Sequence, residues 1–192
     1  MAAIADACLA RKIRAEIAIV LSDRPDAGIL TQARERGLSG EFIAPGNFRT
    51  KLDEDAERGF INRLIAAEVD LVVLAGFMRI LKGDFLRAFP LRVVNIHPSL
   101  LPAFPGLEAW KQALEYGVKV TGCTVHFVDQ GVDSGPIIAQ ETVSILAADT
   151  PTSLHERIQE AERRLYPACI GGLAEGRIAV KGRQTVWIGS GQ

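Results

Sequence analysis

The stretch Val93-Val94-Asn95-Ile96-His97-Pro98-Ser99-Leu100-Leu101-Pro102 decides what the rest of the chain is expected to build. It opens on β-branched residues, which favour a buried strand, and Pro98 must end that strand because it has no N–H to donate. Side chains alternate along a strand, so Asn95 and His97 emerge on the same side at its carboxyl end. Ligands bind at that end in open α/β sheets. The stretch therefore predicts an amide and an imidazole on a rigid element, in a site suited to acyl chemistry.

Composition and charge are those of an ordinary globular chain. Of the 192 residues, 48% are hydrophobic and 23% are charged, which predicts a single domain over residues 1–192 with a sizeable core. The net charge of −1 gives no electrostatic support for nucleic acid or a membrane surface as partner. The longest apolar run, Leu71–Met78, falls far short of the roughly 20 residues that a membrane span needs. We expect small-molecule partners, and the sequence leaves a monomer and a homodimer equally open.

The cysteines and the first residues bear on location. Cys8, Cys123 and Cys169 are odd in number and scattered, which fits a reducing compartment better than a disulfide framework. Charged residues from Asp6 onward interrupt the early apolar residues, so no signal peptide is expected. A cytoplasmic location is predicted.

Hydrophobic periodicity and turn residues divide the chain into alternating strands and helices. Helices are predicted over residues 1–12, 29–36, 53–67, 107–116 and 152–173, with another between Gly76 and Pro90. Strands are predicted over residues 16–21, 70–75, 93–97, 118–128 and 137–143, with a short one near Phe42. Residues 177–192 are expected to form a hairpin, turning at Gly182, and a tail; Pro167 is expected to bend or interrupt the last helix. The alternation indicates an α/β fold with a mostly parallel sheet and a late antiparallel addition.

A second motif, Gly131-Val132-Asp133-Ser134-Gly135-Pro136, places an acid between two glycines. Glycines allow left-handed backbone conformations that would bring the carboxylate close to another group, although Asp and Gly also populate any tight turn. A carboxylate beside an imidazole favours the protonated ring. If Asp133 lies near His97, the histidine becomes a cation that stabilises an oxyanion or donates a proton, with Asn95 as a second donor.

Competing chemistries have weaker support in the sequence. A metal site could be drawn from His97, His126, Cys123 and Asp133, but their spacing matches no known ligand pattern, so no metal is predicted. A serine hydrolase would need a GxSxG elbow, which the sequence lacks, and no GxGxxG or P-loop is present. His126 lies in the middle of a predicted strand and is interpreted as a packed, hydrogen-bonded side chain.

Three ordered motifs, the two above and Gly76-Phe77-Met78-Arg79-Ile80-Leu81, resemble the formyltetrahydrofolate-dependent formyltransferases. Phe104-Pro105-Gly106-Leu107 and Glu162-Arg163-Arg164-Leu165-Tyr166-Pro167 support the match, which covers nearly the whole chain in order. The resemblance implies a Rossmann-like formyltransferase sheet with helices on both faces. It also implies transfer of a formyl group from the co-substrate 10-formyltetrahydrofolate to the amine of glycinamide ribonucleotide, in purine biosynthesis.

The same resemblance implies roles for individual residues. Asn95, His97 and Asp133 match the catalytic set of the family. The residues that would hold the folate are Met78, Arg79, Ile80, Leu81, Asn95 and Val132. The residues that would contact the nucleotide are Ile96, Pro98, Gln159, Glu162 and, with a looser local match, Lys51 or Arg49.

The chain departs from the family at its start. The resemblance implies a first strand and a Gly-rich loop for the substrate phosphate ahead of Met1, and residues 1–8 match the helix that follows that loop. A sheet without this strand would lose core and leave backbone groups unpaired. We therefore expect the 192-residue chain to bind glycinamide ribonucleotide poorly.

The sequence leaves three other functions open. Formyltetrahydrofolate deformylase, a hydrolase, has the same Asn-x-His and Asp arrangement, although Pro98 and Pro105-Gly106-Leu107 favour the transferase. A non-catalytic folate-binding protein is a second alternative, because the phosphate loop is missing. Methionyl-tRNA formyltransferase is disfavoured because the chain is not basic and no C-terminal RNA-binding domain is seen.

Overall fold

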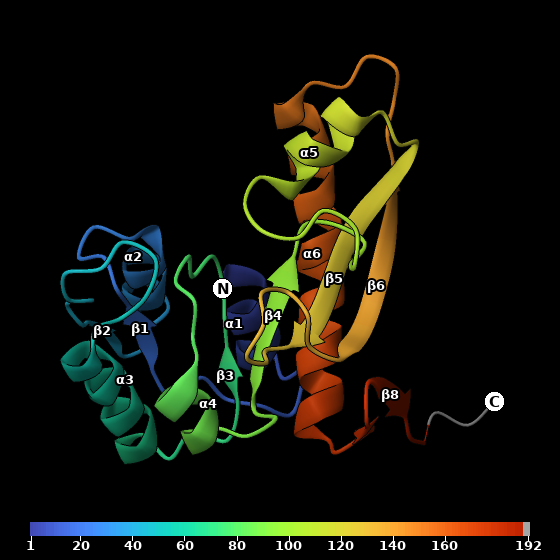
Figure 1. Cartoon of the computed structure of the whole chain (residues 1–192). Helices are drawn as coiled ribbons and strands as arrows, with labels where there is room; N and C mark the ends of the chain where they lie inside the picture. Colours follow the sequence, from blue (N-terminus) through green and yellow to red (C-terminus); the bar gives the residue numbers. More distant parts are fainter. Residues whose placement is uncertain (190–192) are drawn as a thin grey trace.

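The structure is a computed structural model that describes residues 1–189, so residues 190–192 of the predicted tail lie outside the described residues. Helices and strands alternate along the chain as far as residue 127, and strands follow one another directly within residues 120–144 and 178–187 (Figure 1). The helices are α1 (Ala2–Leu9), α2 (Gly28–Glu35), α3 (Glu54–Ala66), α4 (Gly83–Ala88), α5 (Ala109–Tyr116) and α6 (Pro151–Ala174). The strands are β1 (Val20–Ser22), β2 (Gly40–Phe42), β3 (Val72–Val73), β4 (Val93–His97), β5 (Val120–Phe127), β6 (Ile137–Ser144), β7 (Ile178–Lys181) and β8 (Gln184–Trp187).

Strand pairing confirms the predicted α/β fold and its late antiparallel addition. The largest sheet has the order β3-β4-β5-β6, in which β3 and β4 are parallel and the remaining pairs are antiparallel. The strands β1 and β2 form a separate parallel pair. The predicted hairpin is present as β7 and β8, with Lys181 opposite Gln184 across the turn.

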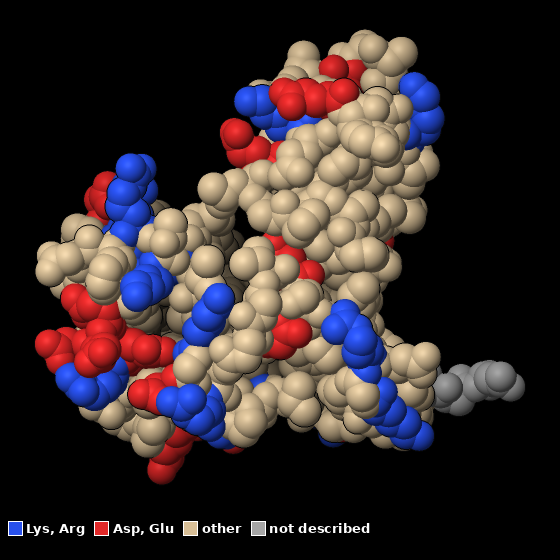
Figure 2. All heavy atoms as spheres, in the orientation of Figure 1, with Lys and Arg blue, Asp and Glu red and all other residues tan. Residues whose placement is uncertain are grey.

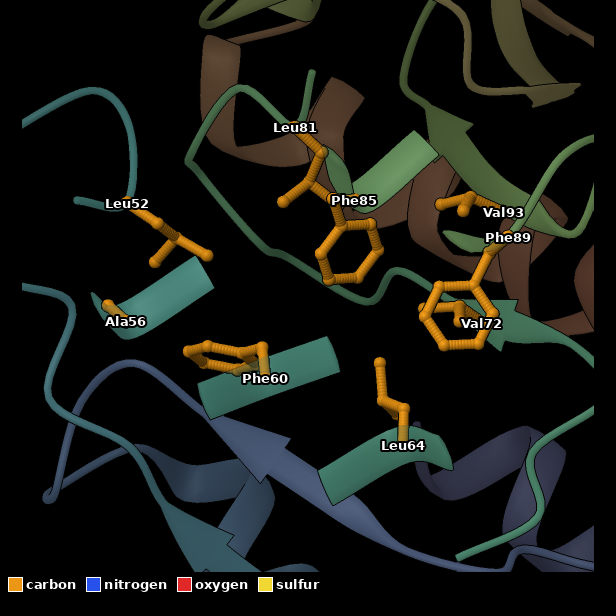
Figure 3. Close-up of a cluster of buried hydrophobic side chains, with 9 residues drawn as sticks. All are labelled: Leu52, Ala56, Phe60, Leu64, Val72, Leu81, Phe85, Phe89 and Val93. Atoms are coloured by element: carbon orange, nitrogen blue, oxygen red, sulfur yellow. The ribbon is translucent and has the colours of Figure 1, made fainter. Parts of the chain in front are cut away.

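Helices cover both faces of the sheet. Neighbouring residues of β4 point in opposite directions, so each face of the strand presents apolar side chains to different helices. Val93, 1% exposed, packs with side chains of α3 and α4 (Figure 3). Val94, fully buried, belongs to a second cluster that includes side chains of α1, β5 and α6. The cluster drawn in Figure 3 consists of Leu52, Ala56, Phe60, Leu64, Val72, Leu81, Phe85, Phe89 and Val93. Two apolar layers therefore hold β4 from opposite sides.

The long helix α6 continues through its internal proline, so the interruption considered at this position is wrong. The helix begins with Pro151 at its first turn, and Thr150 and Ser153 cap each other's backbone N–H groups. A proline inside a helix removes one N–H from the ladder, which leaves the carbonyl four residues earlier without that partner. Here that carbonyl belongs to Arg163, an exposed residue, so water can bind it.

Three local predictions are wrong in extent. The helix expected between Gly76 and Pro90 occupies only Gly83–Ala88, and the segment before it pairs Ile80 with Lys51 through an isolated parallel bridge. The strands expected over residues 16–21 and 70–75 shorten to the bounds of β1 and β3. Among the described residues, each of these two strands pairs on one side only, so a single ladder sets its length.

A cavity of about 1100 Å³ separates the β1–β2 pair from the main sheet. Leu21 lines it from β1, Val73 and Leu74 line it from β3 and the residue after it, and Ile170 lines it from α6. Apolar side chains dominate the lining, and charged residues, among them Arg14, Asp23 and Arg92, also line it. The two pieces of parallel sheet are consequently held together by helices and loops.

Acidic and basic side chains are interspersed over the face of the molecule shown in Figure 2. This mixture agrees with the net charge of −1. None of the helices in the described part of the chain is long and apolar enough to cross a membrane.

The buried Tyr166 links the residue after β3 and the first part of β4 to α6. Its hydroxyl lies 2.9 Å from the carbonyl oxygen of Leu74 and 3.0 Å from that of Val94. The ring is 5% exposed, and burial raises the pKa of Tyr166 well above its usual value. The phenol therefore stays neutral and can donate its proton to either strand.

We predict that Tyr166→Phe lowers the free energy of unfolding by about 1–2 kcal/mol, because a buried hydrogen bond to the backbone carbonyls of Leu74 and Val94 is lost while the ring remains. Tyr116→Phe is the matched control, since Tyr116 is 79% exposed and should change stability by less than about 0.5 kcal/mol. Urea unfolding of both variants measures the difference. Equal effects would contradict the role assigned to the Tyr166 hydroxyl.

Candidate active site

The pairing of β4 with β5 places the polar residues of the site. The two strands are antiparallel and lie side by side in Figure 1, with Asn95 opposite His126 and His97 opposite Thr124. Directly opposed residues share a face of the sheet, with Cβ atoms about 4.5–5.5 Å apart. The register therefore brings four polar side chains together at the carboxyl end of β4.

His97 is nearly buried, with 4% of its surface exposed, and both ring nitrogens face acceptors. Nδ1 lies 3.3 Å from Oδ2 of Asp133, and Nε2 lies 2.9 Å from the carbonyl oxygen of Phe104. Only a doubly protonated imidazole can donate to both neighbours. The structure thus places Asp133 beside His97, as the two sequence motifs predict, in a geometry suited to a cation.

The loop after β5 presents the Asp133 carboxylate in a fixed position. Oδ2 accepts a hydrogen bond of 2.8 Å from the backbone N–H of Gly106. Asp133 itself has a φ of 50°, whereas neither of the flanking glycines has a positive φ. A Cβ at Gly131 would lie 2.0 Å from Oγ of Ser134, and one at Gly135 would lie 1.9 Å from the carbonyl oxygen of Phe127. The glycines therefore serve close approach rather than the left-handed conformation expected of them.

A polar network secures the proline-rich loop that follows β4. The hydroxyl of Thr124, which is buried, donates to the carbonyl of Ser99 at 2.7 Å and accepts from the N–H of Leu101 at 3.0 Å. The side-chain amide of Gln140 donates to the carbonyl of Leu101 at 2.9 Å. Because these bonds fix the loop, they also fix the Phe104 carbonyl against His97.

His126 belongs to the site although the sequence interpretation treats it only as a packed residue. It is 2% exposed, and its Nε2 lies 3.3 Å from Nδ2 of Asn95 and 3.7 Å from Oδ1 of Asp133. The backbone groups of Phe104 and Gly106 are further contributors that sequence reasoning missed. Strand register brings His126 in, and loop closure brings in Phe104 and Gly106. The motif Phe104-Pro105-Gly106-Leu107 supports the family resemblance but does not indicate that its backbone groups contact His97 and Asp133.

Apart from Asn95 on β4, the residues predicted to hold the folate lie in two linked segments. Met78 is 67% exposed, Ile80 is 40% exposed and Val132 is 50% exposed, whereas Leu81 is 5% exposed and packs in the core. The backbone N–H of Gly83 donates to Oε1 of Gln130 at 3.3 Å, which ties the segment after Leu81 to the Asp133 loop. The exposed apolar side chains are therefore available to a ligand.

Arg79, predicted to contact folate, is engaged within the protein. Its Nε lies 2.6 Å from Oδ2 of Asp23, and both side chains are largely buried, at 13% and 16% exposure. Its guanidinium also donates to the carbonyl oxygens of Phe48 and Lys51. The side chain thus joins three segments, and its backbone is the part left for a ligand.

The residues predicted to bind the nucleotide divide between two regions. Ile96 and Pro98, both half-buried, flank His97, and Gln159 and Glu162 lie on α6. Ile96 also packs against the clusters that contain α6 side chains. Lys51 lies elsewhere, with Nζ 4.2 Å from the ring centroid of Phe48 and its backbone bridged to Ile80. The structure therefore connects Lys51 with the predicted folate segment.

The described residues contain no group of three or more His, Cys, Asp or Glu arranged to hold a metal. Cys123 packs among Leu154, Ile158 and Ala161, and burial raises its pKa to about 12. The thiol is therefore a neutral core group.

Glu162 is a titrating group on the predicted binding face of α6. Burial raises its pKa to about 7 from the ordinary 4.5, and the nearby charge of Arg163 partly opposes this rise. The folded protein therefore holds a proton on Glu162 that the unfolded chain has already lost between these two pH values. The resulting stabilisation is complete below pH 4.5 and is lost as the pH rises through about 7.

We predict that Glu162→Gln stabilises the protein relative to wild type more at pH 8 than at pH 5, by on the order of 2 kcal/mol, because the amide has no proton to lose. Urea unfolding at the two pH values measures the difference. Glu160→Gln is the control, since Glu160 is exposed on the same helix. A Glu162→Gln effect that does not change with pH would contradict the raised pKa.

Comparisons with known proteins agree with this arrangement. The protein family described as formyl transferase matches residues 1–170. A phosphoribosylglycinamide formyltransferase of Mycobacterium tuberculosis (strain ATCC 25618 / H37Rv) is 56% identical over 161 residues, covering 81% of this chain and 74% of that protein. A trifunctional purine biosynthetic protein adenosine-3 of Drosophila melanogaster is 46% identical over 167 residues, which cover 87% of this chain; the chain spans only 12% of that protein.

Solved structures show the same likeness. Glycinamide ribonucleotide transformylase 1 from Symbiobacterium toebii superposes with a TM-score of 0.93 at 48% identity, covering 98% of this chain and 88% of that chain. A formyltetrahydrofolate deformylase from Pseudomonas syringae pv. tomato str. DC3000 superposes with a TM-score of 0.89 at 26% identity, covering 98% of this chain and 61% of that chain. The transformylase is thus closer in sequence than the deformylase. The chain belongs to the formyl transferase family.

Proposed function

We propose that the chain transfers the formyl group of 10-formyltetrahydrofolate to the amine of glycinamide ribonucleotide, a reaction of purine biosynthesis. The observation that carries the proposal is the buried His97 held between Asp133 and the Phe104 carbonyl, with the Asn95 amide on the same face of β4. A cation and an amide donor placed together suit a reaction that develops negative charge on oxygen. Membership of the formyl transferase family and the names of its relatives support this substrate pair.

The reaction proceeds by attack of the substrate amine on the formyl carbon. A carbon–nitrogen bond forms, and the carbonyl electron pair moves to the oxygen, where the Asn95 N–H donates and the His97 cation supplies positive charge. The bond between the formyl carbon and the folate nitrogen then breaks. The folate nitrogen leaves with a proton, and the amine loses one, so no net acid or base is consumed. The Asp133–His97 pair can hold that proton between the two events.

The binding residues follow from the same proposal. Met78, the backbone of Arg79, Ile80 and Val132 contact the folate, and Leu81 holds their segment to the core. Ile96, Pro98, Gln159 and Glu162 contact the nucleotide. Glu162 faces its amine or amide end, where a carboxyl group of pKa about 7 can accept or donate a hydrogen bond.

Hydrolysis of the formyl donor is the second candidate function. It is supported by the solved deformylase, which shares the fold over 98% of this chain. The transformylase from Symbiobacterium toebii and the formyltransferase of Mycobacterium tuberculosis are 48% and 56% identical to this chain, whereas the deformylase is 26% identical. The higher identity favours the transferase.

We predict that His97→Ala lowers the rate of formyl transfer by at least about a hundredfold, because the charge beside the developing oxyanion is lost. Binding of tetrahydrofolate, measured by calorimetry, should weaken by less than about threefold, since the folate segments lie on other loops. A circular dichroism spectrum confirms that the variant folds. Turnover within tenfold of wild type would refute the assignment of His97.

The two candidate functions differ in their products. With glycinamide ribonucleotide in large excess, because weak binding of this substrate is expected, the wild-type protein should form formylated glycinamide ribonucleotide and tetrahydrofolate in equal amounts, with formate below a tenth of the product. Chromatography of the nucleotide and an enzymatic formate assay measure the two. Formate release that equals folate turnover, with or without the amine, would establish the hydrolase instead.

A further inference from the structure

His126 lies directly opposite Asn95 and uses both ring nitrogens. Nδ1 is 2.8 Å from the carbonyl oxygen of Phe127, and Nε2 is 3.3 Å from Nδ2 of Asn95. The residue is 2% exposed, so neither nitrogen has free access to water. The two partners differ in kind, and this difference fixes where the proton is.

The carbonyl oxygen of Phe127 can only accept, so Nδ1 of His126 carries a hydrogen. In the neutral ring Nε2 is then an acceptor, and it receives an N–H of the Asn95 amide. Burial lowers the pKa of His126, and the charge of His97 acts in the same direction, whereas the Phe127 carbonyl and the charges of Asp133 and Asp129 oppose it. The net direction favours the neutral ring at neutral pH.

The neutral ring determines which way the Asn95 amide points. With one N–H bound to Nε2 of His126, the amide keeps its second N–H for a ligand. The reversed amide would set its oxygen against the lone pair of Nε2, where two acceptors repel. We infer that His126, in its Nδ1–H form, is a positioning residue that holds the Asn95 amide with an N–H toward the formyl oxygen. The inference rests on the proposed transfer reaction.

With His126 neutral, Asp133 keeps its contacts with His97 and Gly106. Oδ1 of Asp133 is 3.7 Å from Nε2 of His126, beyond hydrogen-bond distance, and Oδ2 lies within reach of His97 and Gly106. Protonation of His126 would add an N–H that faces Asp133 and would remove the acceptor for Asn95. Protonation of His126 would therefore disturb both Asp133 and Asn95, the two side chains that act together with His97.

Two substitutions of His126 test whether the acceptor at the position of Nε2, rather than the size of the ring, is what matters. In His126→Gln the side-chain oxygen can occupy the place of Nε2 and accept from Asn95, whereas His126→Asn reaches only the place of Nδ1. We expect His126→Asn to lower kcat at least about tenfold more than His126→Gln, with KM for both substrates changed by less than about threefold, because an oxyanion donor is misdirected. Equal losses in two folded variants, or losses confined to KM, would overturn the inference.

A double-mutant cycle tests whether His126 acts through Asn95. Once Asn95→Ala has removed the amide, His126→Asn should lower kcat by less than about twofold. Independent, additive losses would overturn the inference. Thermal unfolding of all four proteins shows whether each one folds.

A measurement on the ligand-free protein separates this inference from the proposed function. Nitrogen-15 NMR of the histidine rings should show His126 at pH 7.5 with a protonated Nδ1 and an unprotonated Nε2. The opposite tautomer, or a doubly protonated ring, would overturn the inference whatever reaction the protein performs. Absence of formyl transfer in wild-type protein with the expected tautomer would refute the proposed function and would leave the Asn95 orientation intact.

Discussion

The antiparallel register of β4 and β5 is the constraint on which the site depends. It sets Asn95 opposite His126 on one face and buries Val94 and Val125 completely on the other. Because the side-chain period of a strand is two residues, a slip of one position would turn Asn95 and His97 toward the cluster of Val94 and Val125 and would separate them from His126. Burial of Val94 and Val125 thus fixes the register that sets Asn95 opposite His126. The same register sets His97, two residues after Asn95, opposite Thr124.

Two loops from different parts of the chain then supply the polar partners of His97. The loop after β4 brings the Phe104 carbonyl to His97, and the loop after β5 brings Asp133 to the same ring. The Gly106 N–H joins the two loops by binding the Asp133 carboxylate. Each polar group thus has its partner fixed before a ligand enters. A site organised in this way loses little free energy on reorganisation during the reaction.

The sequence by itself predicted the order of helices and strands, and it singled out Asn95, His97 and Asp133 as the candidate catalytic residues. Alternation along the run at Val93 places Asn95 and His97 on one face, and Pro98 ends the strand for covalent reasons. The motif around Asp133 identifies an acid between two glycines, although their role in close approach, rather than in a left-handed backbone, appears only in the structure. These features depend on local geometry, in which a few neighbouring residues are enough to decide the outcome.

Only the tertiary structure decided which groups meet across long stretches of chain. His126 meets Asn95 across 31 residues, and Gly106 meets Asp133 across 27. Arg79 appears in the sequence as a ligand contact, yet it is buried against Asp23, 56 residues away. Such pairs depend on strand register, on loop closure and, for Arg79, on whether a carboxylate of the protein or a ligand binds the guanidinium. Local propensity encodes none of these. The central residues are therefore visible in the sequence, and the groups that orient them are visible only in the fold.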